Sequence, residues 1–138
     1  MDLDEALALA RSPLWSERGR SGQQLSSFAG GAAADDALRG LLLDEGDTAV
    51  IDATGLALLE RGDQAAWKVL ASVWLVAPPE QADHLTSLLS QTLFRVSSDQ
   101  GEAARLKSIL TTLAADGDAD ARAGAKDLLR QVGSSLPT

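Results

Sequence analysis

The chain has 138 residues, of which 45% are apolar and 23% are charged, and 20 acids against 12 Lys and Arg give a net charge of -8. This composition excludes a wholly disordered chain, and the length predicts a single domain over residues 1–138. The absence of cysteine excludes disulfides, thiolate nucleophiles and Cys-containing metal sites. The negative charge disfavours nucleic acid and anionic membranes as partners.

The same charge favours a protein partner with a basic or mixed-charge surface, although solubility alone also explains it. The chain begins with acids, unlike the basic start of a secretory signal. No apolar run approaches the roughly 20 residues that span a bilayer. We therefore expect a cytoplasmic location and no membrane partner.

Two segments precede the expected core. Residues 2–11 are predicted to form a short N-terminal helix, because Asp2 and Glu5 have the spacing of a capping box. Residues 12–34 contain four glycines and many small polar residues. That composition predicts a loop-rich segment with at most one or two single helical turns.

Three Gly-Asp pairs, at 46–47, 62–63 and 117–118, punctuate the remaining chain between apolar helical runs. In each pair, Asp is placed to cap the next helix, and Gly is placed to end the previous one with a positive φ. Connections this short predict antiparallel neighbours in an all-α fold.

The core is expected over residues 35–133, followed by a disordered tail at 134–138. Its helices are predicted at residues 35–43, 47–61, 64–77, 79–96, 99–115 and 118–132. The helix over 64–77 is predicted to be the most buried, with a polar stripe of Gln64, Lys68 and Ser72. Gly55 inside a helix predicts the close approach of another helix.

The segment 116–133, DGDADARAGAKDLLRQVG, resembles the HEAT and armadillo families of helical repeats. The residues that carry the resemblance are Asp118, Arg122, Ala125, Leu128 and Leu129. It implies a right-handed stack of helices that acts as a protein-binding scaffold, without catalytic residues. We therefore expect a short stack of antiparallel helical hairpins, a HEAT-like α-solenoid fragment, with an irregular helical bundle as the alternative.

One acidic pattern raises the question of calcium. Asp116, Asp118 and Asp120 alternate as in a calcium loop, and Asp127 falls at the twelfth position. Ala121, however, stands where the loop needs glycine. Caps at a helix N-terminus explain the same acids, so a calcium site is the less favoured interpretation.

Catalytic chemistry has little support. His84 is the only histidine and stands four residues after Glu80, but a catalytic zinc site needs about three protein ligands. We expect His84 at the solvent edge of the core. Neither a G-x-S-x-G motif nor a phosphate-binding glycine loop occurs, so we expect no enzyme and no cofactor.

Aromatic residues supply the remaining candidates. Phe94 shares one helix side with acids and Gln91, which suits an interface anchor, although packing against the turn at Ser97 explains it equally well. Trp67 and Trp74 are seven residues apart on one side of their helix, a spacing more typical of a core than of a contact surface. The candidate partner-binding residues are Phe94, Asp83, Glu80, Gln91, Trp67 and Trp74.

The favoured hypothesis is a small acidic protein-protein interaction module. A bacterial immunity or antitoxin protein that neutralises a partner toxin is the alternative, and a metal-binding helical protein is a further one. The oligomeric state and the partner are not specified by these patterns.

Overall fold

The structure is a computed structural model that describes residues 1–135, of which 79% are helical and none lies in a strand. The all-α class is therefore confirmed. The helices are α1 (Leu3–Leu9), α2 (Trp15–Leu25), η1 (Ser26–Phe28, a 3-10 turn), α3 (Ala32–Leu42), α4 (Thr48–Arg61), α5 (Gln64–Trp74), α6 (Pro79–Ser97), α7 (Gln100–Leu113) and α8 (Ala119–Ser135).

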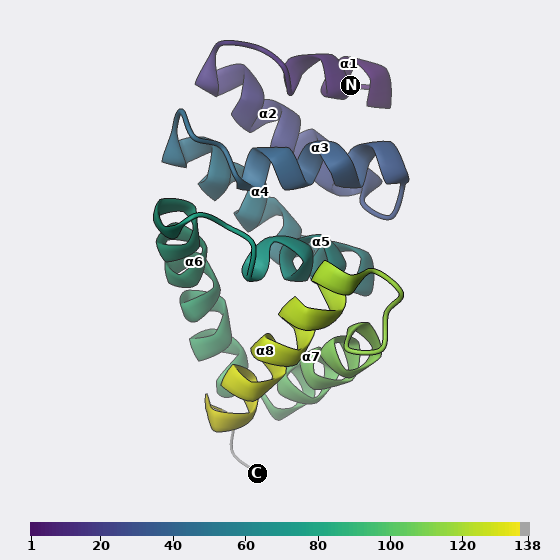
Figure 1. Ribbon diagram of the computed structural model, residues 1–138, viewed down its shortest axis with the longest axis vertical. Coiled ribbons are helices and arrows are strands. Elements are labelled where there is room, and N and C mark those ends of the chain that lie inside the picture. Colours follow the sequence, from purple (N-terminus) through teal and green to yellow (C-terminus); the bar gives the residue numbers. More distant parts are fainter. Residues whose placement is uncertain (136–138) are drawn as a thin grey trace.

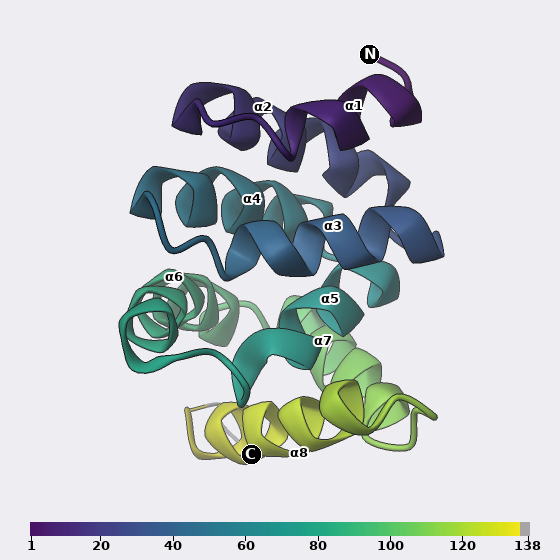
Figure 2. The ribbon, with the colours of Figure 1, turned by 45° about the horizontal axis from the view of Figure 1, so that its top comes forward.

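The helices pack in successive layers from α1 at one end of the molecule to α8 at the other (Figure 1). The hairpins α1–α2 and α3–α4 stack on each other, mainly through α2 and α4 (Figure 2). Beyond them, α5 packs closely on α8, whereas α6 packs on α4 and α7. The eight α-helices of residues 1–135, packed in this way, are compatible with a helical repeat.

Helix α2 replaces the loop expected within residues 12–34. Its small residues Gly19, Ser21 and Gly22 are buried, and a Cβ built on Gly22 would lie 2.0 Å from Thr54 Oγ1 on α4. Ser21 Oγ donates a 2.6 Å hydrogen bond to the Ala6 carbonyl on α1. The glycine and serine content therefore serves close helix packing, which outweighs the low helix propensity that suggested a loop.

Aspartate caps begin the next helices as predicted. Asp47 accepts from the Ala49 N–H and Asp63 from the Ala66 N–H, and Gly62 ends α4 with a φ of 62°. The prediction of a positive φ was wrong for Gly46 and Gly117. At Gly46 the reason is local, because the Asp44 carboxylate accepts the N–H groups of the two residues that precede α4.

Two glycines allow helices to approach closely. A Cβ on Gly55 would lie 3.0 Å from Leu88 Cδ1 of α6, which confirms the predicted close packing there. The closest approach joins α8 to α5, where a Cβ on Gly124 would lie 1.9 Å from the Ala71 carbonyl oxygen. These glycines set how near α4 and α5 lie to their neighbours.

Helix α5 is buried along most of its length, as expected, but its polar stripe is incomplete. Ser72 is buried, and its hydroxyl donates to the Val69 carbonyl over 2.6 Å, so it needs no water. The helix ends at Trp74, three residues before the predicted end.

Helix α8 continues past Gly133 to Ser135, so the expected disorder is wrong for residues 134–135, and residues 136–138 lie outside the described part.

Candidate interaction surface

Helix α6 presents one buried face and one exposed face. Pro78 precedes it, Pro79 is its first residue, and Leu85, Leu88 and Leu89 anchor it in the core. The opposite face is exposed from Glu80 to the C-terminal end. We define the α6 outer face by the exposed residues between Ser87 and the C-cap Ser98, which are Ser87, Ser90, Gln91, Phe94, Arg95 and Ser98.

Phe94 is the outstanding member of this face, since 81% of its surface is exposed. The alternative that it packs against the turn at Ser97 is therefore wrong. Ser97 Oγ instead donates to the Phe94 carbonyl over 2.7 Å, a contact with the backbone. The Phe94 ring projects from a surface of serine and glutamine side chains.

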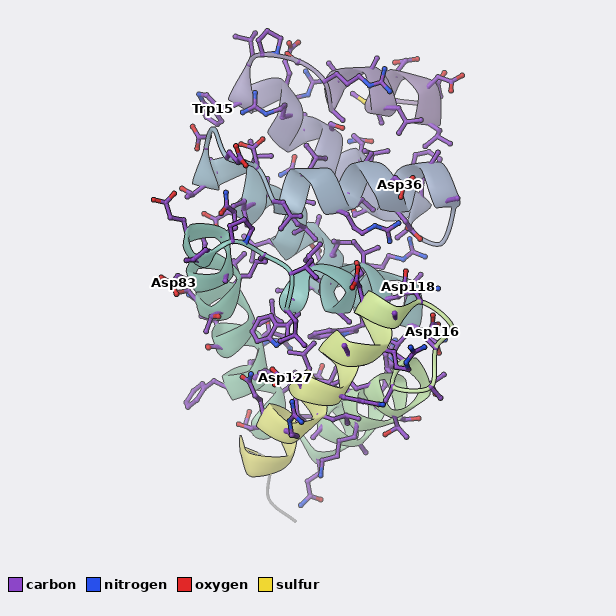
Figure 3. The ribbon with its side chains drawn as sticks, in the orientation of Figure 1. Trp15, Asp36, Asp83, Asp116, Asp118 and Asp127 are labelled. Atoms are coloured by element: carbon purple, nitrogen blue, oxygen red, sulfur yellow. The ribbon has the colours of Figure 1, made fainter. Side chains whose placement is uncertain are left out.

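The acids expected around Phe94 lie at the other end of the helix. Asp83 precedes Phe94 by 11 residues and Glu80 precedes it by 14, which on a continuous helix corresponds to roughly 16 Å and 21 Å along the axis. Asp83 marks the outer edge of α6 near its start (Figure 3). Gln91, one turn from Phe94, is the only polar candidate that the structure brings next to it.

The two tryptophans do not belong to this face. Trp67 is 4% exposed and is part of the core. Trp74 is half-buried, and its Nε1 donates a 2.8 Å hydrogen bond to Asp127 Oδ2 on α8. Both side chains therefore hold α5 in place, the role that their seven-residue spacing favoured.

The acids of the calcium-like pattern accept hydrogen bonds from backbone N–H groups and pair with nearby cations. Asp118 accepts the Asp120 and Ala121 N–H groups at the start of α8, and Asp116 accepts the Asp118 N–H. Asp127 lies further along α8, beside Trp74 and apart from Asp116 and Asp118 (Figure 3). Within residues 1–135 no cluster of His, Asp and Glu has an arrangement that would hold a metal ion.

Hydrogen bonds shift the titration of these carboxyl groups. The Asp118 N–H, followed by Lys68, lowers the pKa of Asp116 against the opposing effect of burial. The pKa of Asp127 is lowered first by Arg130 and then by the Trp74 indole. Both groups are therefore held in the ionised form, which suits caps and structural pairs.

His84 belongs to α6, and its side chain contacts α4. Its Nε2 is 2.6 Å from Asp52 Oδ1, and both side chains are partly exposed. The expectation of a solvent-edge histidine agrees with this position. The partner was missed because Asp52 is 32 residues away and on another helix, so no local spacing points to it.

A cavity of about 370 Å³ lies where the C-terminal ends of α4 and α6 meet α5 and α7. Its apolar lining includes Leu59, Trp67, Leu106 and Ile109. The charged lining consists of Glu60, Arg61, Arg95, Glu102 and Arg105. Sequence reasoning missed this site, because its residues come from four helices and share no motif.

Further apolar side chains are exposed away from α6. Leu14 and Trp15 lie at the start of α2, Leu75 and Val76 follow α5, and Leu56 projects from α4. Among the described helices, none combines the length and apolar character that crossing a bilayer requires.

Comparisons with protein-family models, with curated proteins and with solved structures found no match to this chain.

Proposed function

We propose that this protein is a HEAT-like helical stack that binds another protein through the α6 outer face, with Phe94 as the anchor. The observation that carries the proposal is the 81% exposure of Phe94 on a helix whose other large apolar side chains are turned inward or half-buried. Large aromatic side chains supply much of the binding energy in protein interfaces. An exposed phenylalanine gains this energy when a partner covers it.

The surroundings of Phe94 support the same proposal. Between Asp83 and Asp99 the sequence holds a single permanently charged residue, Arg95, in a chain that is 23% charged. The centres of protein interfaces are depleted in charged residues and enriched in aromatic residues and arginine. Serine and glutamine side chains around Phe94 lose less hydration energy on contact than carboxylates would.

The acids at the start of α6 define the edge of the proposed interface. Glu80 and Asp83 are exposed and have no ion pair within the described residues. A basic or mixed-charge rim on the partner would be attracted to them, which mainly raises the association rate. The partner is therefore expected to combine an apolar pocket for Phe94 with basic residues about 16 to 21 Å away.

Affinity purification from the source organism tests this function with three tagged proteins. These are the wild type, Phe94→Ala, and Leu56→Ala as a matched control, because Leu56 is an exposed aliphatic residue on another helix. A stoichiometric partner retained by wild type and Leu56→Ala but lost by Phe94→Ala supports the proposal. Retention of the same partner by Phe94→Ala, with all three proteins folded, contradicts it.

A further inference from the structure

We propose that the cavity between α4, α5, α6 and α7 binds a small organic acid, with an apolar group against Leu106 and Ile109 and its carboxylate toward Trp67 and Arg105. The site shares Arg95 with the α6 outer face but does not depend on the proposed partner. Its volume of about 370 Å³ lies within the range of small-molecule pockets. Its lining combines aliphatic and aromatic side chains with charged ones, so it can contact an apolar group and an ionised group of one ligand.

The floor of the cavity offers an unused hydrogen-bond donor. Trp67 is 4% exposed and lines the cavity, and its indole N–H meets no acceptor among the described residues but keeps some contact with solvent. The other core-facing tryptophan, Trp74, has its N–H paired with Asp127. Water can reach this N–H, so a ligand acceptor would take the place of water at a donor that no protein group uses.

The cations of the cavity differ in how they are engaged. Arg61 donates to Asp63 and to the Ser26 carbonyl, and Arg95 donates to Glu102 over 3.2 Å. Arg105 is exposed and has no ion pair within residues 1–135. It is therefore the guanidinium available to a ligand.

The unpaired cation of the lining directs the anionic end of a ligand. Arg61, Arg95 and Arg105 line the cavity with Glu60 and Glu102, but Arg61 is paired with Asp63 and Arg95 with Glu102. Arg105 is therefore the cation left for a carboxylate, which has to lie on the Arg105 side because Glu60 in the same lining repels it. A carboxylate matches a guanidinium and an indole N–H, because it accepts several hydrogen bonds at once.

The apolar part of the ligand would pack against the aliphatic side chains of the cavity. Leu106 and Ile109 are one turn apart on α7 and line the cavity together with Leu59 of α4. Covering these side chains removes apolar surface from water. A ligand with an aryl or alkyl group a few bonds from its carboxylate would meet both features.

Proton-nitrogen correlation spectra test the proposal, because each tryptophan indole gives one resonance. The probe is 4-phenylbutyrate, and its neutral isostere 4-phenylbutanamide is the matched control. We expect the acid to shift the Trp67 resonance in a saturable manner and the amide to bind at least about tenfold more weakly, the loss typical of one charge-assisted hydrogen bond. Single Trp→Phe variants assign the three resonances.

Two arginine variants separate the site from general electrostatics. Arg105→Gln should raise the dissociation constant of the acid about tenfold. Arg20→Gln, at an exposed arginine on α2 outside the cavity, should leave it unchanged. Trp67→Phe, which keeps the aromatic floor but removes the N–H, should also weaken the acid more than the amide.

Three results would overturn the proposal. The first is the absence of a saturable Trp67 shift with 4-phenylbutyrate in a folded protein. The second is equal binding of the acid and the amide, which would indicate a merely apolar cavity. The third is equal weakening by Arg105→Gln and Arg20→Gln, which would indicate attraction by overall charge.

Discussion

Trp74 Nε1 donates a 2.8 Å hydrogen bond to Asp127 Oδ2 and so joins α5 to α8 across 53 residues of sequence. Asp127 also accepts from Arg130 Nη2 and Gln131 Nε2 on its own helix. Next to this bond, Gly124 lies against the backbone of Ala71. The joint between these helices therefore combines close backbone packing with a charge-assisted hydrogen bond.

Asp127 should make the stability of the protein depend on acidic pH. Its pKa in the folded state is lowered by Arg130 and then by Trp74, so the ionised carboxyl group stabilises the fold above the unfolded pKa of about 3.9. This contribution is lost as the pH falls through the lower, folded pKa. In urea unfolding, Asp127→Asn should be less stable than wild type near neutral pH, and the difference should shrink below about pH 4. A difference that stays constant down to about pH 3 would contradict this account.

The Trp74–Asp127 bond should appear as coupling between the two side chains. Trp74→Phe removes the indole donor and part of the packing, and is expected to lower the free energy of unfolding by about 1 to 3 kcal/mol. The double variant with Trp74→Phe and Asp127→Asn should lose less unfolding free energy than the sum of the losses in the two single variants. Strict additivity in a double-mutant cycle would show that the bond contributes nothing.

The glycine at the α5–α8 contact should not tolerate a methyl group. In Gly124→Ala the new Cβ would meet the Ala71 carbonyl oxygen, a backbone atom that cannot turn away, so we expect a loss of about 3 kcal/mol of unfolding free energy. Gly40→Ala on α3 is the matched control, because nothing lies within 4 Å of its added Cβ. It should raise stability by up to about 1 kcal/mol, since alanine has the higher helix propensity. Similar effects of the two substitutions would contradict the close approach.

Thr54 on α4 carries a hydroxyl whose Oγ1 is buried without a hydrogen-bond partner in the described structure. Thr54→Val removes this polar atom and keeps the shape, so stability should be unchanged or higher by up to about 1 kcal/mol. Thr54→Ser keeps the hydroxyl and removes the methyl group, and should cost about 1 kcal/mol. A valine variant less stable than the serine variant would show that Oγ1 has an acceptor.

Local rules predicted the features that depend on a few neighbouring residues. Asp47 and Asp63 cap their helices because a cap needs only the next turn of the chain. The fold class followed from the same signals. The position of α6, predicted over residues 79–96, followed from the helical period of its apolar residues.

Features that depend on distant contacts were missed. Helix α2 was predicted as loop because the value of Gly22 lies in its contact with Thr54, 32 residues further along the chain. The contact between His84 and Asp52 and the cavity around Trp67 were missed for the same reason, because their residues are far apart in the sequence. In the candidate surface, sequence placed Phe94 on the outside of its helix, but the distance from Phe94 to the acids required the continuous helix α6.

Site-specific photocrosslinking at position 94 tests the proposed interaction most directly. The photoreactive residue p-benzoylphenylalanine is placed at position 94, with position 56 as the control, because both native side chains are exposed and apolar. Irradiation in the source organism should yield a discrete crosslinked protein from position 94 and not from position 56. Discrete crosslinks from position 56 alone, or none from position 94 at normal expression, would contradict the assignment of the α6 outer face as the binding surface.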